Sequence, residues 1–239
     1  MSEGLRLVLA TRWEDWIRGG HLARVLRRCA TAGWIGPPTW MQANWKPRRR
    51  PVPDQPAVDP VDRILALLPH DVEAARALDV GGVDDSWKLS LLVAPFLAGA
   101  ERAAGIHILA LDLPAIDPAD ARACFEGVVA EGSAEYGWLH PRASAERLQR
   151  ATARDPAYTG PIFAVLHWCS FLGAPVLAEF AEGTAARLDV LSRAAVTGRD
   201  GRDGVLLVTS ERPEEAASEA GERRLLALTR TFRLARRIG

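Results

Sequence analysis

The sequence is poor in cysteine, with three in 239 residues and no CxxC pair. Cys29, Cys124 and Cys169 are odd in number and widely spaced, which fits neither a disulfide framework nor a zinc knuckle. A chain of this length can bury a sizeable hydrophobic core, so it requires no covalent or metal staple. We therefore expect three buried free thiols.

The sequence also lacks long apolar runs. No stretch approaches eighteen consecutive apolar residues, which argues against a membrane-spanning helix. The first four residues, Met-Ser-Glu-Gly, have neither the basic segment nor the apolar stretch of a signal peptide. These absences predict a cytoplasmic protein that has no membrane partner.

Net charge is absent as well, because thirty basic side chains balance thirty acidic ones. Nucleic-acid-binding proteins usually carry a positive excess, so we expect no nucleic-acid partner. The charge is unevenly distributed, however. Residues 5–50 hold ten Lys and Arg against two acids, and residues 53–85 hold eight acids against two arginines. Either these stretches face each other or form solvated faces, or they make a polarised surface that steers a charged partner.

Metal-binding motifs are missing. The five histidines are His21, His70, His107, His140 and His167. None belongs to an HExxH motif or to a short pairing with a carboxylate, so each is interpreted as a packed or surface histidine. The sequence predicts no metal site and no cofactor.

Nucleophile and phosphate motifs are missing too. Ser170 lacks the first glycine of a GxSxG elbow, and Cys169 near His167 is weak support for a thiol–imidazole pair. The loop at residues 198–204 has glycine at every third position but lies between two predicted strands. A phosphate-binding loop would have to open a helix, so this segment indicates a hairpin turn. We expect no catalytic residues.

The pattern of apolar residues predicts an α+β fold with a mixed, largely antiparallel sheet flanked by helices. Strands are expected at residues 5–10, 37–45, 87–94, 106–113, 136–140, 194–197 and 205–210. Helices are expected at residues 14–32, 59–68, 117–130, 144–153 and 222–237. Asp59-Pro60 and Asp117-Pro118 each supply an N-cap and a first-turn proline. Residues 1–239 are expected to form a single domain with a Pro/Arg-rich loop at about 46–60.

Eight tryptophans are the main anomaly, and five of them lie among basic residues in the first 45 positions. Most should pack in the core, because indoles bury a large area. Trp and Arg also dominate protein interfaces, and Trp40 and Trp45 beside the Arg triplet are expected to be exposed. The acidic pair in Gly81-Gly82-Val83-Asp84-Asp85-Ser86 indicates a turn before a strand. The predicted partner-binding residues are Trp40, Trp45, Arg48, Arg49, Arg50, Asp84 and Asp85.

Several segments, in order, resemble a known family. They are WKLSL (87–91), IHILALDLP (106–114), EYGW (135–138), HWCSFLG (167–173) and DGVLL (203–207). This order resembles the immunity protein 52 family and related bacterial proteins that guard cells against polymorphic or type VI-secreted toxins. The resemblance spans roughly residues 85–210, and the first 80 residues match it less well.

The resemblance implies a non-enzymatic protein that binds and neutralises a cognate toxin, with no catalytic residues to carry over. It does not indicate which surface binds the toxin, and it is compatible with a homodimer. Two alternatives remain. One is an enzyme whose site is assembled from scattered residues such as His140, His167 and Asp112. The other is an adaptor or structural component of a secretion or phage-like assembly.

Overall fold

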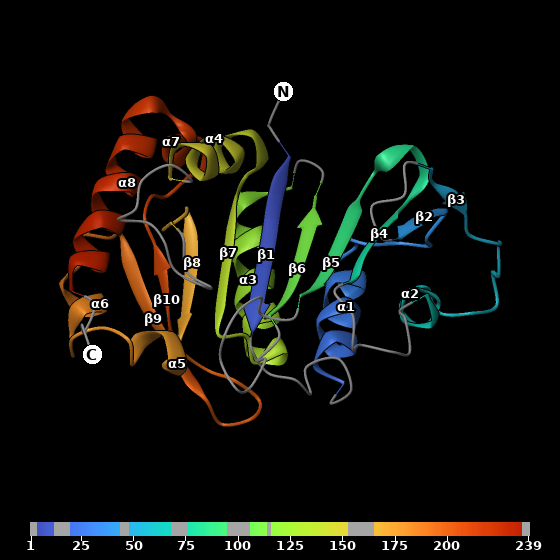
Figure 1. The fold of residues 1–239 in the computed structure, drawn as a ribbon, viewed down its shortest axis with the longest axis horizontal. Helices are drawn as coiled ribbons and strands as arrows, with labels where there is room; N and C mark the ends of the chain where they lie inside the picture. Colours follow the sequence, from blue (N-terminus) through green and yellow to red (C-terminus); the bar gives the residue numbers. More distant parts are fainter. Residues whose placement is uncertain are drawn as a thin grey trace.

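The structure of the protein is a computed structural model that describes residues 4–11, 20–43, 48–67, 76–94, 106–113, 116–152 and 165–235. These residues form a ten-stranded antiparallel sheet with helices packed on it, so the α+β prediction is confirmed. Figure 1 shows the sheet running across the molecule, with β3 at one end and β9 at the other. In the described part of the chain, no helix is long and apolar enough to cross a membrane.

The strands are short, and their bounds follow the chain. They are β1 (Leu5–Thr11), β2 (Trp40–Ala43), β3 (Arg50–Pro51), β4 (Arg76–Gly81), β5 (Lys88–Ala94), β6 (Ile106–Asp112), β7 (Tyr136–Pro141), β8 (Cys169–Gly173), β9 (Ser192–Thr197) and β10 (Asp203–Val208). Within the described ranges, eight helices and one 3-10 turn accompany them. They are α1 (His21–Thr31), α2 (Pro60–Ala66), η2 (Val83–Asp85), α3 (Pro118–Gly132), α4 (Arg142–Thr152), α5 (Ala174–Leu177), α6 (Thr184–Arg187), α7 (Pro213–Ala217) and α8 (Glu219–Leu234).

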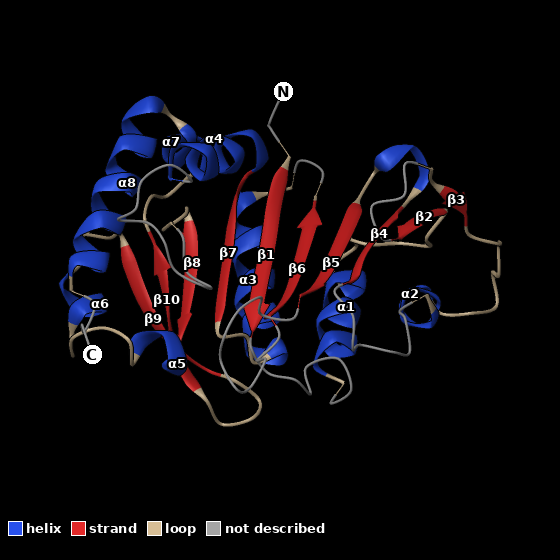
Figure 2. Cartoon of the chain, in the orientation of Figure 1, coloured by secondary structure: helices blue, strands red, loops and turns tan. Residues whose placement is uncertain are grey.

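The strand order is β3-β2-β4-β5-β6-β1-β7-β8-β10-β9, and each neighbouring pair is antiparallel. The first strand, β1, lies in the interior of the sheet between β6 and β7. Both neighbours run opposite to β1, so β6 and β7 are parallel to each other. Helix α3 connects these two strands across β1 (Figure 2).

Capping residues set the starts of two helices as the sequence predicts. Asp59 accepts a hydrogen bond from the backbone N–H of Val61 at 2.8 Å, and Asp117 accepts one from Ala119 at 2.9 Å. Each helix has proline in its first turn, where a missing N–H costs nothing. After α1, Gly33 adopts a left-handed conformation with φ of 72°, which glycine tolerates without steric cost.

The two faces of the sheet carry different helices. Leu9 of β1 packs toward Gly132 of α3, which also lies against Val25 of α1, so α1 and α3 share this face. Successive side chains of a strand point to opposite faces. Arg6 therefore lies on the other face, where it approaches Glu146 of α4 at 3.5 Å. Helix α8 packs beside α4 on that same side (Figure 2).

Some sequence predictions need correction. Strand β4 was not predicted, and the 46–60 segment contains the two-residue edge strand β3 within what was expected to be a loop. The predicted helix at 14–32 is described only from His21 onward; residues 14–19 lie outside the described residues. Trp13, Trp16 and Trp45 lie outside them too. The three cysteines are free and buried, as predicted.

Candidate functional site

Six of the seven predicted partner-binding residues are described, and they lie near the β3 end of the sheet with Trp40 at their centre. Trp40 lies in β2, opposite Pro51 of β3 and Gly81 of β4. Its ring lies on Gly81 so closely that a methyl group there would overlap the indole. Trp40 is only 8% exposed, so the prediction of an exposed indole is wrong. The reason is local: Gly81 and Arg49 both pack closely against the ring and shield it from solvent.

Arg49 is the arginine that covers Trp40. Its guanidinium carbon lies 3.9 Å from the centre of the indole ring. The same guanidinium donates through Nη1 to both carboxylate oxygens of Asp85, at 2.8 and 3.0 Å. Planar guanidinium groups favour both contacts, stacking on an aromatic face and pairing with a carboxylate. Arg49 is therefore held in place from two directions while half of its side chain remains exposed.

Other predicted residues surround this contact. Arg48, Arg50 and Asp84 are exposed, as are Val83 and Asp85 of the η2 turn. Val83 is an apolar side chain with 61% of its surface exposed, and the sequence did not single it out. We define the Arg49 patch by its seven members. They are Trp40, Arg48, Arg49, Arg50, Val83, Asp84 and Asp85.

The η2 turn presents its two aspartates in an uncommon backbone conformation. Asp84 and Asp85 have φ of 51° and 54°, in the left-handed region where aspartate is tolerated better than most residues. The preceding glycine pair seats two indoles, because a methyl group at Gly82 would overlap Trp87 just as one at Gly81 would overlap Trp40. The interpretation of this segment as a turn is confirmed. The two consecutive glycines are the sequence signal for the close approach of the two indole rings.

A buried arginine fixes the segment that carries the patch. Arg63 of α2 is only 6% exposed, and it donates to the carbonyl oxygens of Pro38 at 3.3 Å and Pro53 at 2.6 Å. Pro38 precedes β2 and Pro53 follows β3, so one side chain ties both flanks of the patch to α2. Asp54 lies 3.6 Å from the same guanidinium.

Among the residues that the structure describes, the oppositely charged stretches of the sequence meet at two places. Arg27 pairs with Asp62 at 3.2 Å, and Arg49 pairs with Asp85 at 2.8 Å. All four side chains are about half exposed, so solvent screens both pairs and each adds little to stability. The structure therefore joins the two stretches at these pairs and leaves Arg48 and Arg50 exposed at the surface.

The residues of the alternative enzyme hypothesis lie apart from the patch. His140 lies one residue before the end of β7 and His167 precedes β8, and their ring centres are 5.3 Å apart. Asp112 of β6 instead binds Arg6, with the closest atoms 2.5 Å apart. The structure thus brings the two histidines together and pairs the aspartate elsewhere.

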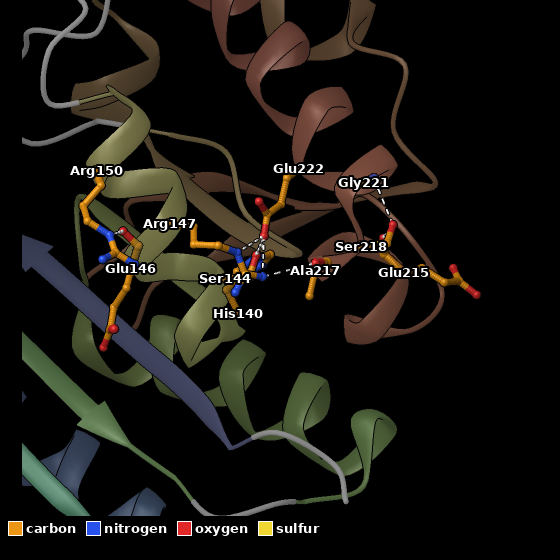
Figure 3. Close-up of polar contacts among 10 residues, drawn as sticks. All are labelled: His140, Ser144, Glu146, Arg147, Arg150, Glu215, Ala217, Ser218, Gly221 and Glu222. Atoms are coloured by element: carbon orange, nitrogen blue, oxygen red, sulfur yellow. Dashed lines mark hydrogen bonds and ion pairs between the residues drawn. The ribbon is translucent and has the colours of Figure 1, made fainter.

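His140 belongs to a chain of hydrogen bonds that Figure 3 shows. Its Nδ1 accepts from the backbone N–H of Trp168 at 3.0 Å, so in the neutral ring the proton is on Nε2. Nε2 then donates to Ser144 Oγ at 2.8 Å, and Ser144 donates to Glu222 at 2.6 Å. Arg147 completes the chain by donating to the same Glu222 oxygen at 2.6 and 2.9 Å.

The direction of this chain is opposite to that of a catalytic triad. A triad histidine accepts the serine proton, whereas His140 donates to Ser144 and the serine donates to a carboxylate. Both His140 and Ser144 have no exposed surface. The chain therefore links β7, α4 and α8 as a buried polar network. The sequence did not indicate Ser144 or Glu222, because their contact joins residues 78 positions apart.

Burial also keeps both histidines neutral. Desolvation lowers the pKa of His140 well below its ordinary value, with added repulsion from His167 and Arg147. Desolvation lowers the pKa of His167 to about 3, partly countered by the backbone of Val165. His167 stacks on Trp138 with ring centres 4.1 Å apart, and neither of its nitrogens makes a well-formed hydrogen bond.

Three hollows are formed by described residues, and neither His140 nor His167 lines any of the three. A hollow of about 700 Å³ is lined by Asp117, Arg122 and Arg212, with Trp168 in its wall, and by neither histidine. In the described ranges, no group of three His, Cys, Asp or Glu side chains is placed to hold a metal ion. Burial raises the pKa of each of the three cysteine thiols, that of Cys124 to about 11.

Comparison with known proteins yields a structural likeness. No protein-family model matches the chain, and no curated protein sequence matches it. The fold is similar to that of the Pseudomonas aeruginosa T6SS protein PA0821, with a TM-score of 0.58. The likeness covers 96% of this chain and 76% of that one at 12% sequence identity, so it shows a shared fold.

Proposed function

We propose that this protein is a non-enzymatic immunity protein that binds and neutralises a cognate bacterial toxin through the Arg49 patch. The observation that carries the proposal is the arrangement of Trp40, Arg49 and Asp85. Three segments converge to hold one half-exposed arginine in a fixed orientation. A side chain that is ordered before binding loses less entropy in the complex, and arginine is enriched among interface hot spots.

Two further observations support a binding role. The sequence segments at 85–210 resemble the immunity protein 52 family, and the fold is similar to that of a protein described as belonging to a type VI secretion system. The patch also combines charges of both signs with the exposed apolar side chain of Val83. Such a mixture suits a protein partner better than a nucleic acid, for which aspartates would be repulsive.

The enzyme alternative is less well supported by the histidine pair. His140 and His167 are buried, and the hydrogen atom of Ser144 is directed to Glu222. A general base must reach the proton that it removes. The adaptor alternative uses the same patch without neutralisation, so it differs from the proposal in one measurable outcome, which is protection of the cell.

Co-expression tests the proposal. The toxin encoded beside this protein is induced in a sensitive host with and without the protein, and survival is counted. The proposal predicts full protection and a complex that co-purifies. Replacing Arg48, Arg49 and Arg50 together by alanine should reduce both. Undiminished killing together with no measurable complex would contradict the proposal, and a complex without protection would support the adaptor alternative.

A further inference from the structure

The two ends of the sheet differ in how they are protected. Edge strands expose unpaired backbone groups, and proteins blunt them with short length, proline or charge. Strand β3 has all three features, because it is only two residues long and consists of the charged Arg50 and Pro51. Strand β9 is six residues long with no proline or lysine, and five of its residues are exposed. Its single charge, Arg193, donates to the carbonyl oxygens of Ala185 and Leu188 and is thereby directed back toward α6.

The hydrogen-bond pattern defines which β9 groups face outward. At the hairpin, the backbone N–H of Gly198 donates to the carbonyl oxygen of Arg202 at 2.7 Å. Hydrogen-bonded pairs alternate with non-bonded pairs along an antiparallel ladder, so the next hydrogen-bonded pair of β9 and β10 is Val196 with Gly204. The bond from Thr209 to Trp168 on the other side of β10 gives the same alternation. The intervening β9 residues turn their N–H and C=O groups away from β10. They are Arg193, Ala195 and Thr197.

We propose that β9 pairs with β9 of a second copy of this chain, antiparallel about a two-fold axis at Ala195. Ala195 then lies opposite itself, and Arg193 lies opposite Thr197 of the other copy. In a hydrogen-bonded pair of an antiparallel ladder, both opposite residues direct their N–H and C=O groups toward each other. This register places outward-facing residues opposite outward-facing residues, as such pairs require. All three outward residues of each strand are used, which gives about six hydrogen bonds between the copies. The two sheets become one.

Side chains agree with this register. Arg193 of one copy lies beside Thr197 of the other, and the Thr197 hydroxyl donates to Asp203 at 2.7 Å. The guanidinium of Arg193 stays bonded to the α6 carbonyl oxygens, so no like charges are directly opposed across the pair. Ala195 at the axis is small enough to meet its own copy. On the other face Ala194 meets Val196, an apolar pair. This self-complementarity favours a second copy over a strand of another protein.

The inference does not depend on the proposed function. The Arg49 patch belongs to strands at the opposite end of the sheet order, so a dimer through β9 leaves it free. Self-association is measured on the purified protein alone, without a toxin. Failure of one idea is therefore distinguishable from failure of the other.

Cysteine cross-linking tests the register with a matched pair of variants. In Ala195→Cys the two new thiols lie on directly opposite residues about 5.5 Å apart between Cα atoms, a separation that a disulfide spans. In Ala194→Cys the two new residues are diagonal neighbours about 7–8 Å apart, which is too far to bridge. The three native cysteines are buried and should not react. We expect a covalent dimer from Ala195→Cys and monomer from Ala194→Cys on a non-reducing gel.

Mass in solution provides the second measurement. The wild-type protein should sediment at twice the 26.0 kDa of one chain. Ala195→Lys places two lysines opposite each other at the axis and should sediment as a monomer that still unfolds in one cooperative transition. Ala57→Lys makes the same substitution at an exposed position outside β9 and should remain dimeric. A monomeric wild-type protein, equal cross-linking of both cysteine variants, or cross-linking of Ala194→Cys alone would overturn the proposal.

Discussion

Replacing His167 by phenylalanine should stabilise the fold, and more so in acid than at neutral pH. His167 is 1% exposed, stacks on Trp138, and has no well-formed hydrogen bond at either ring nitrogen. Phenylalanine keeps a flat ring in that position and removes two buried polar atoms. A buried polar group without a partner costs about 1–3 kcal/mol, so a gain of that order is expected at pH 7.

The pH dependence follows from the direction of the pKa shift. The folded-state pKa of His167 is lowered to about 3, below the unfolded value of about 6.5. Between these values the unfolded chain binds the proton and the folded chain does not. Stability is therefore fully present above about pH 6.5 and is lost as pH falls toward 3. From pH 7 to pH 5 the loss due to His167 is about 2 kcal/mol.

Urea denaturation at pH 7, 6 and 5 measures this effect. The difference in free energy of unfolding between the His167→Phe variant and the wild type should grow by about 2 kcal/mol from pH 7 to pH 5. Both proteins share every other titrating group, and His140 stays neutral in both because desolvation is the largest cause of its lowered pKa. Equal denaturant slopes would confirm that both unfold the same structure. A difference that stays constant with pH would refute the reasoning, since it would mean that His167 is not a buried neutral group.

Three further substitutions test separate features of the fold by urea or thermal unfolding. Gly81→Ala places a methyl group against the Trp40 ring and should destabilise by about 1–3 kcal/mol, whereas an unchanged midpoint would mean that the ring does not rest there. Ser144→Ala leaves Nε2–H of His140 buried without an acceptor and should cost about 1–3 kcal/mol; no loss would dismiss the network. Asp117→Ala removes the N-cap of α3 and should cost about 1 kcal/mol, while Asp117→Asn should retain most of the stability.

The sequence predicts elements whose ends are chemically marked. Asp59-Pro60 and Asp117-Pro118 each specify a helix start by a side-chain acceptor followed by a ring with no donor, and the structure has both caps. The β9–β10 hairpin is similarly marked by the glycines of its loop, one of which, Gly201, has φ of 78°. These signals act over a few residues and need no tertiary contact.

Other features depend on contacts between distant segments. Strand β4 contains Asp79 within its apolar run and ends at Gly81, so its local pattern resembles a loop. It is a strand because β2 and β5 pair with it on both sides. The position of β1 within the sheet is likewise unspecified by its own residues. Packing across the whole sheet decides it.

The candidate site could be predicted in part. Charge and aromatic content select Trp40, Arg49 and Asp85 from two segments separated in the chain. No local pattern indicates which of the three consecutive arginines will stack on the indole of Trp40. The contact of that indole with Gly81 joins distant segments, so the local sequence does not predict it either. The same contact that buries Trp40 makes Arg49 the exposed member of the pair.

The binding affinity of the cognate toxin for two single-arginine variants tests the central claim most directly. Arg49 and Arg27 each pair with an aspartate and are each about half exposed, but Arg27 lies outside the patch. Titration calorimetry should show that Arg49→Ala weakens binding by about 2 kcal/mol or more, which is about 30-fold in Kd. Arg27→Ala should leave Kd unchanged. Equal affinities for the two variants, or no binding by the wild-type protein, would contradict the account.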